Sequence, residues 1–202
     1  MNLQTLIFIG RSGCGKGTQA ELLGKYIQEN DKEGRDIFYL VTGDQFRKLI
    51  KKKNYTGNLA LKIYDDASRQ PDFLAVYLWS SVLIDEFSGD QHLIIDGTPR
   101  SLSEIEILDT AMKFYGREKP VFIYMNVTSQ WAIERLYGRG RLDDAAFENL
   151  KIKQKWFDSD VIPAIKYAKK NPLYRFVEIN GEQSIEEVHQ EIIQKIFPKN
   201  KE

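Results

Sequence analysis

The sequence predicts a doubly wound α/β fold, in which helices cover both faces of a five-stranded parallel sheet. Three observations predict it. Several short runs are apolar almost throughout, as in strands buried on both faces. Helix-compatible segments alternate with these runs. A chain of 202 residues that is 42% hydrophobic is large enough for one substantial core. We therefore expect a single domain spanning residues 1–202.

The elements follow one another in a regular order along the chain. Five runs predict the strands, at residues 3–9, 37–41, 92–95, 121–127 and 175–179. Six segments between and after them predict helices, at residues 18–28, 71–87, 102–114, 130–137, 144–169 and 185–196. Ligands of such sheets bind beyond the carboxyl ends of the strands. We therefore expect the functional residues directly after each strand.

Composition excludes several classes of function. Lys plus Arg and Asp plus Glu both number 29, so no basic excess indicates a nucleic-acid or membrane-surface partner. The single cysteine excludes an internal disulfide framework and a cysteine-based zinc site. No apolar run approaches the roughly 20 residues that a membrane span needs, and no secretory leader pattern opens the chain. We expect a cytoplasmic protein.

The segment after the first predicted strand has the P-loop pattern G-x-x-x-x-G-K-[ST], except that Gly17 precedes Thr18. Glycines allow the loop to turn its backbone N–H groups toward a polyphosphate. The helix that follows points its positive dipole end at the same place. Lys16 can reach the β- and γ-phosphates, and the Thr18 hydroxyl can help to place Mg²⁺. The segment predicts triphosphate binding.

Charged and polar residues also follow the second and third strands. Thr42 can cap the next helix, and Arg47 lies about one turn inside it, which suits an anion. Asp96 ends the third strand and suits a carboxylate that orients water around Mg²⁺. The tight turn 97–99 then brings Arg100 into the same region. We expect these groups to face the P-loop.

A third basic group comes later in the chain, where Arg135, Arg139 and Arg141 fall within seven residues and Asp143 and Asp144 follow. Transfer of a γ-phosphoryl group between anionic oxygens develops charge that cations and Mg²⁺ must hold. Arginines at three distant places in the sequence therefore predict two phosphate-bearing substrates that face each other.

Together these motifs resemble the adenylate kinase and nucleoside monophosphate kinase family. The matching motifs are G-x-x-G-x-G-K-G-T-Q from Gly10, T-G-D with Arg47, D-G-x-P-R ending at Arg100, and the arginine and aspartate group at 135–144. The resemblance covers effectively the whole chain. It implies a P-loop NTPase-type fold with an acceptor-binding helical insert at about 45–72 and a minimal lid at about 138–143.

The resemblance also implies an activity and assigns roles to residues. It implies a monomer that reversibly transfers the γ-phosphoryl group of ATP to a nucleoside monophosphate, AMP first, with Mg²⁺ and without zinc. Residues placed at ATP are Gly13, Cys14, Gly15, Lys16, Gly17, Thr18, Arg139 and Gln183. Residues placed at the monophosphate are Thr42, Gly43, Arg47, Gly97, Arg100, Glu104, Arg141 and Lys153. Those placed in catalysis are Lys16, Arg100, Arg139 and Arg141, and those placed at Mg²⁺, largely through water, are Thr18 and Asp96.

Three positions depart from the family pattern. Glu104 stands where the family carries a glutamine that reads adenine, Thr98 replaces an aromatic residue, and Lys153 replaces an arginine. An ionised glutamate cannot donate a hydrogen bond to adenine N1, and it suits guanine better. We therefore expect Glu104→Gln to raise the preference for AMP. CMP, UMP, dCMP and GMP stay open as alternative acceptors.

Two other functions stay open as well. One is a P-loop kinase for a small molecule that is not a nucleotide, which need not carry the motifs around Arg47 and Arg100. The other is a non-catalytic nucleotide-binding module. Its support is limited to the departures at Glu104 and Lys153.

Overall fold

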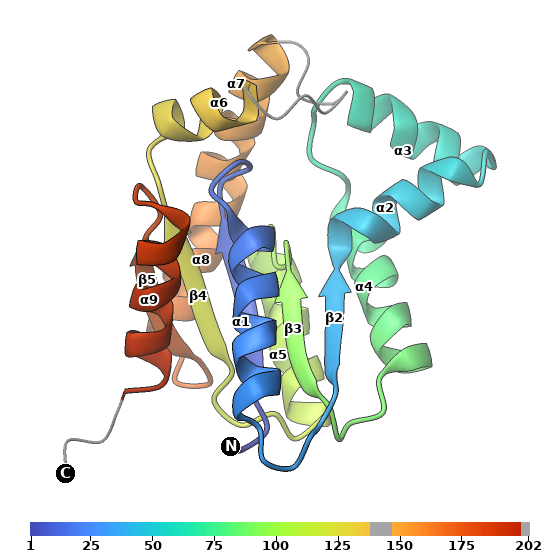
Figure 1. The fold of residues 1–202 in the computed structure, drawn as a ribbon. Coiled ribbons are helices and arrows are strands. Elements are labelled where there is room, and N and C mark those ends of the chain that lie inside the picture. Colours follow the sequence, from blue (N-terminus) through green and yellow to red (C-terminus); the bar gives the residue numbers. More distant parts are fainter. Residues whose placement is uncertain (138–146, 199–202) are drawn as a thin grey trace.

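The computed structural model describes residues 1–137 and 147–198. Within them the five predicted strands form one parallel sheet with the order β2-β3-β1-β4-β5 (Figure 1). Their bounds are β1 (Thr5–Gly10), β2 (Ile37–Val41), β3 (His92–Asp96), β4 (Val121–Asn126) and β5 (Arg175–Asn180). The predicted α/β class and parallel sheet are confirmed. The strand bounds shift by two residues or fewer.

The alternation of side chains along β1 builds two cores. Leu6 and Phe8 pack into a cluster with residues of α1 (Lys16–Asn30) and α9 (Ile185–Ile196) on one face of the sheet. Ile7 and Ile9 belong to a cluster on the other face. That cluster also contains residues of α4 (Asp72–Glu86), α5 (Leu102–Phe114) and α8 (Ile162–Lys170). All four side chains are 2% exposed or less, which explains why the run is apolar throughout.

Two helices project from the core after β2. They are α2 (Thr42–Lys51) and α3 (Tyr55–Asp65), and a loop returns the chain from α3 to α4. They occupy the part of the chain where the sequence predicts an acceptor-binding insert, and they form an arm beside the sheet (Figure 1). Side chains of α2, α3 and α4 form a separate hydrophobic cluster, which holds the arm against α4.

The segment predicted to be helical at 144–169 is helical over its described part, but it is not a uniform α-helix. The chain forms α7 (Phe147–Trp156), a π-helical turn (Phe157–Val161) and then α8, which has a proline at its start. In a π-helical turn an extra residue widens the helix, and this changes which side chains face the core afterwards. Phe157 and Val161 are buried, and the acidic residues between them point elsewhere. Helical periodicity alone does not reveal such a turn.

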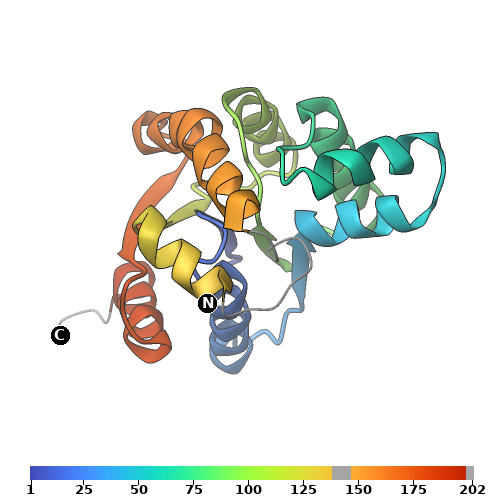
Figure 2. The same cartoon turned by 90° about the horizontal axis from the view of Figure 1, so that it is seen from above.

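The carboxyl ends of the strands meet at one end of the molecule. Seen from above this end, α6 (Ser129–Tyr137), α7 and the α2–α3 arm surround the loop that joins β1 to α1 (Figure 2). Within the described ranges, none of the helices is both long enough and apolar enough to traverse a lipid bilayer.

Candidate functional site

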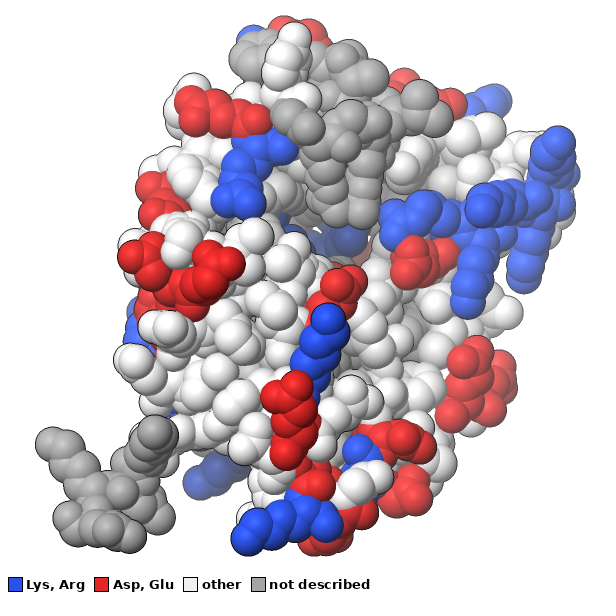
Figure 3. All heavy atoms as spheres, viewed as in Figure 1, with Lys and Arg blue, Asp and Glu red and all other residues white. Residues whose placement is uncertain are grey.

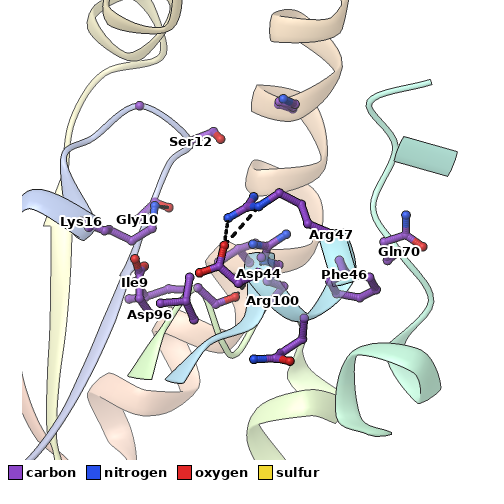
Figure 4. A pocket seen from close by; sticks show the side chains of 18 of the residues that line it. Ile9, Gly10, Ser12, Lys16, Asp44, Phe46, Arg47, Gln70, Asp96 and Arg100 are labelled. Carbon is purple, nitrogen blue, oxygen red and sulfur yellow. Dashed lines mark hydrogen bonds and ion pairs between the residues drawn. The ribbon is translucent and has the colours of Figure 1, made fainter. Parts of the chain in front are cut away.

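A cleft of about 1250 Å³ opens at the carboxyl end of the sheet. One of its sides is the loop between β1 and α1, and the other is formed by α2, the loop before α4, and α7 (Figure 4). Many of the predicted site residues line it, namely Gly13, Gly15, Lys16, Gly17, Thr18, Gly43, Arg47, Asp96, Gly97, Arg100 and Lys153. Residues from distant parts of the sequence therefore meet in one cavity, as predicted.

The glycines of the first loop are required by close packing. A Cβ atom on Gly10 would lie 2.6 Å from the Met125 carbonyl oxygen, and one on Gly13 would lie 2.7 Å from that of Ala132. The φ angle of Gly13 is +90°, which other residues rarely adopt. The loop is thus pressed between β4 and α6, and its polar backbone is left to face the cleft.

Helix α1 begins at Lys16, and its cap residue, Gly15, provides no side-chain hydrogen bond to the first N–H groups. Such N–H groups and the helix dipole attract an anion. The Lys16 ammonium lies at the base of the loop, where it donates to the carbonyl oxygens of Gly10 at 2.8 Å and Arg11 at 2.9 Å. A strong cation and a helix N-terminus therefore converge on one side of the cleft.

The other side of the cleft carries more cations (Figure 4). Arg47 is ion-paired with Asp44 and is partly exposed. The Nε atom of Arg100 donates to the Gly97 carbonyl oxygen at 2.8 Å, and its guanidinium lies 5.9 Å from the ring centre of Trp156. Burial lowers the pKa of Arg100 below its usual range. A guanidinium that is shielded from water forms stronger hydrogen bonds to an anion than one that is fully solvated.

Lys153 reaches the same cleft from α7 and is 8% exposed. Further lysines line the outer rim, and Figure 3 shows positive side chains gathered over the α2–α3 arm. The exposed lysines at the end of α2 are Lys48, Lys51, Lys52 and Lys53. Of these, Lys48 and Lys51 line the cleft. The arm is locally basic although the chain as a whole has no net charge, and such a rim attracts anions from solution.

The prediction that Thr42 caps α2 is wrong. Val41 is the cap residue and Thr42 is already helical, with only 1% of its surface exposed. The Thr42 hydroxyl forms a hydrogen bond of 2.6 Å with the Thr98 hydroxyl, and Thr42 does not line the cleft. The side chain therefore ties the start of α2 to the turn after β3.

Glu104, which the sequence analysis places at the acceptor base, is not among the residues that line the cleft. Its side chain is fully buried beneath the turn after β3 and does not line the cleft. One carboxylate oxygen accepts from the Thr98 hydroxyl at 3.0 Å, and the other accepts from the Arg100 backbone N–H at 2.6 Å. The Ser101 hydroxyl accepts from the Glu104 N–H and so caps α5. Glu104 therefore shapes the turn that presents Arg100.

Cys14 and Gln183 lie beside the cleft. Both line a small adjoining cavity of about 20 Å³, together with Arg135. The Cys14 sulfur is buried 3.6 Å from the Lys16 ammonium. The Arg135 guanidinium lies 4.6 Å from the Trp131 ring centre and borders both cavities. This cavity continues from the side of the cleft that the P-loop forms.

The predicted residues Arg139 and Arg141 lie outside the described residues, as does the predicted lid at 138–143. Several residues that line the cleft were not predicted as site residues, among them Gln70 and Trp156. Gln70 precedes a proline in an irregular loop, and Trp156 ends a helix whose periodicity assigns aromatic residues to the core. Neither carries a motif, so no signal in the sequence pointed to them.

A family model described as adenylate kinase matches residues 8–173. A curated adenylate kinase from Flavobacterium psychrophilum is 29% identical over 187 residues, which cover 91% of this chain and 93% of that protein. Adenylate kinase 1 of a Nostoc species is 29% identical over 187 residues, covering 93% and 95%. The adenylate kinase of Leptospira biflexa is 29% identical over 198 residues, covering 96% and 100%.

Proposed function

Because this chain belongs to the adenylate kinase family, it is a nucleoside monophosphate kinase that transfers the γ-phosphoryl group of ATP to AMP, and we propose how its cleft divides between the two nucleotides. ATP binds on the side of the P-loop and α1. AMP binds on the side of α2 and the turn after β3. The observation that carries this division is that Lys16 and the pair Arg47 and Arg100 line the same cleft from opposite sides.

On the ATP side, backbone N–H groups of the loop and the N-terminus of α1 hold the phosphates, and Lys16 stabilises the transferring group. Arg47, Arg100 and Lys153 hold the phosphate of AMP, so that its oxygen faces the γ-phosphorus in line. Arginine suits this task because its planar fork binds phosphate oxygens in pairs. We also assign Arg139 and Arg141 to the transferring group, because they occupy the arginine positions of the family motif. Their positive charges would offset the negative charge that develops during transfer.

Mg²⁺ is the cation that the site fits. Thr18 and Asp96 both line the cleft, and a Cβ atom on Gly17 would lie 3.5 Å from an Asp96 carboxylate oxygen, so the carboxylate lies beside the start of α1. Among the described residues no cluster of three or more acidic, His or Cys side chains could hold a metal. This suits an ion that arrives with ATP and takes one or two protein oxygens. When bound, it neutralises charge on the β- and γ-phosphates.

The experiment that tests the function is an assay of ADP formation with ATP, Mg²⁺ and each of AMP, CMP, UMP, dCMP and GMP. We expect AMP to give the highest kcat/KM. Omission of Mg²⁺ should abolish turnover, and its replacement should restore it. Equal rates with AMP and GMP, or none with AMP, would contradict the assignment.

A further inference from the structure

We propose that the π-helical turn Phe157–Val161 is a joint that fixes the separation of the ATP side and the AMP side of the cleft. Arg11 and Arg69, which pair with its acidic residues, act as positioning residues. The inference rests on the proposed function, because it concerns how the two nucleotides are aligned. It starts from two side chains, one in each wall, that meet the same turn of helix.

The first of these is Arg11. It belongs to the P-loop, but it does not line the cleft and its side chain is only 13% exposed. Its guanidinium donates to an Asp158 carboxylate oxygen at 2.5 Å and lies 4.6 Å from the Phe157 ring centre. It also donates to the carbonyl oxygen of Val127, after β4, at 3.3 Å. The guanidinium is thus committed to holding the loop in place, and it faces away from the phosphates.

The second is Arg69, in the loop between α3 and α4. Its Nε atom donates to Asp160 at 2.7 Å, and its guanidinium also pairs with Asp72 at the start of α4. Close by, the Trp156 indole N–H donates to the Ala67 carbonyl oxygen at 3.1 Å. The loop that forms the wall of the AMP side is therefore fastened to the same helical segment as the P-loop.

The geometry of a helix explains how one turn holds two walls. Side chains two residues apart point to nearly opposite sides of a helix, so Asp158 and Asp160 face different elements. Phe157 and Val161, which are 2% and 1% exposed, anchor the turn in the core beneath the sheet. A π-helical turn provides the extra residue that allows both arrangements at once. Such turns recur at functional sites in helices.

The same helical segment also reaches the reacting groups. Lys153 and Trp156 on α7 line the cleft, and the Arg100 guanidinium lies over the Trp156 ring. A shift of the turn would therefore move the P-loop, the wall of the AMP side and the Arg100 contact relative to one another. Phosphoryl transfer is sensitive to such a shift, because misplacing the reactants by about 1 Å can cost roughly 10²-fold in rate.

The test replaces each carboxylate by its isosteric amide. Asp158→Asn and Asp160→Asn remove one charge each, and Asp85→Asn on the exposed outer side of α4 is the matched control. Steady-state kcat and the KM for each nucleotide are measured well below the melting temperature of each variant, with folding checked by circular dichroism. We expect Asp158→Asn to raise the KM for ATP and Asp160→Asn to raise the KM for AMP. Each should lower kcat about tenfold relative to the control.

The double variant distinguishes a joint from two separate structural contacts. If the turn sets one separation, the loss of either ion pair already releases it, and the double variant should lose much less kcat than the product of the two single losses. Arg11→Lys, which keeps the charge but lacks the fork, should fall between the wild type and Asp158→Asn. Single variants within twofold of Asp85→Asn, or losses that multiply in the double variant, would overturn the proposal.

The wild-type enzyme in the same assay separates this proposal from the proposed function. A wild type that makes no ADP from ATP and AMP would contradict the function itself. In that event calorimetric titration of ATP and AMP into the same variants tests the joint. Asp158→Asn should weaken ATP and Asp160→Asn should weaken AMP, and unchanged affinities would overturn the joint.

Discussion

At the scale of single residues, Glu104 is a buried acid whose side chain accepts a hydrogen bond from the backbone of the turn after β3. Its two oxygens accept from Thr98 and from the Arg100 N–H, and the Thr98 hydroxyl in turn meets that of Thr42. Burial raises the pKa of Glu104 above its usual value, although these hydrogen bonds and the Arg100 charge oppose that rise. Two of the departures from the family pattern, Thr98 and Glu104, are therefore partners in one small network.

Because of this network, we no longer expect Glu104→Gln to raise the preference for AMP. A glutamine oxygen can accept from the Arg100 N–H and its amide can donate to Thr98, whose hydroxyl can then donate to Thr42. We expect the ratio of kcat/KM for AMP and GMP to stay within about twofold of the wild type. A rise in AMP preference would contradict this expectation and would support a contact between Glu104 and the acceptor base.

The same variant has a predicted pH dependence. Because the folded pKa of Glu104 is raised, its favourable contribution to stability is complete below the unfolded value of about 4.3 and is lost as pH rises through the folded pKa. The free energy of unfolding of Glu104→Gln should therefore improve relative to the wild type between pH 4 and pH 7. Urea titrations at both values measure it, and an unchanged difference would contradict the assignment.

Arg100 is the residue whose loss should cost most in rate. It is desolvated and has its Nε atom held by Gly97, so its remaining N–H groups are preorganised for phosphate. We expect Arg100→Ala to lower kcat by roughly 10³–10⁵ while calorimetry finds ATP affinity within about threefold. Arg175→Ala, an exposed arginine at the start of β5, is the control. A loss of less than tenfold for Arg100→Ala would remove Arg100 from the phosphate site.

At the scale of elements, the P-loop depends on contact with the elements behind it. Gly13 and Gly15 have nearly the same φ angle, +90° and +93°, but only a Cβ on Gly13 meets a neighbour. The nearest atom is the Ala132 carbonyl oxygen, at 2.7 Å. Alanine at Gly15 therefore tests backbone strain alone, whereas alanine at Gly13 tests backbone strain together with overpacking.

Gly15→Ala should destabilise the fold by about 1–2 kcal/mol, the cost of a left-handed backbone for alanine. Gly13→Ala should cost about 1–3 kcal/mol more, because the loop must move away from α6. Urea unfolding without nucleotide measures both changes. Equal losses would show that the contact with α6 does not hold the loop.

At the scale of the whole molecule, the end of the sheet opposite the cleft is held by a buried carboxylate. Asp31, after α1, pairs with Arg35 and meets the His92 ring at 3.2 Å, and its side chain is fully buried. The Arg35 guanidinium holds the pKa of Asp31 far below its usual range. The contact between Asp31 and His92 joins the end of α1 to the start of β3, at the end of the sheet opposite the cleft.

A depressed pKa means that Asp31 contributes stability above its unfolded value of about 3.9 and that this contribution is lost as pH falls below it. Asp31→Asn should therefore be less stable than the wild type at pH 7, and the difference should shrink below pH 3.9. Thermal unfolding between pH 2.5 and 7 measures this, with kcat unchanged at 25 °C. A difference that stays constant with pH would contradict the ion-pair explanation.

The sheet, the P-loop and most of the cations that line the cleft could be predicted from the sequence, because buried parallel strands and phosphate loops impose local patterns. Gly10, Lys16, Asp96 and Arg100 could be placed after their strands for that reason. The hydrogen bonds between distant segments are known only from the folded structure. They hold the Glu104 side chain beneath the turn after β3, where it does not line the cleft.

The partners of the π-helical turn are also known only from the tertiary structure. Its two acids, Asp158 and Asp160, meet arginines that lie far apart in the sequence, Arg11 and Arg69. Nothing local in the segment from Phe157 to Val161 announces those partners. Local periodicity reports the face that a helix buries, whereas the elements that its exposed acids hold together are known only once the chain is folded.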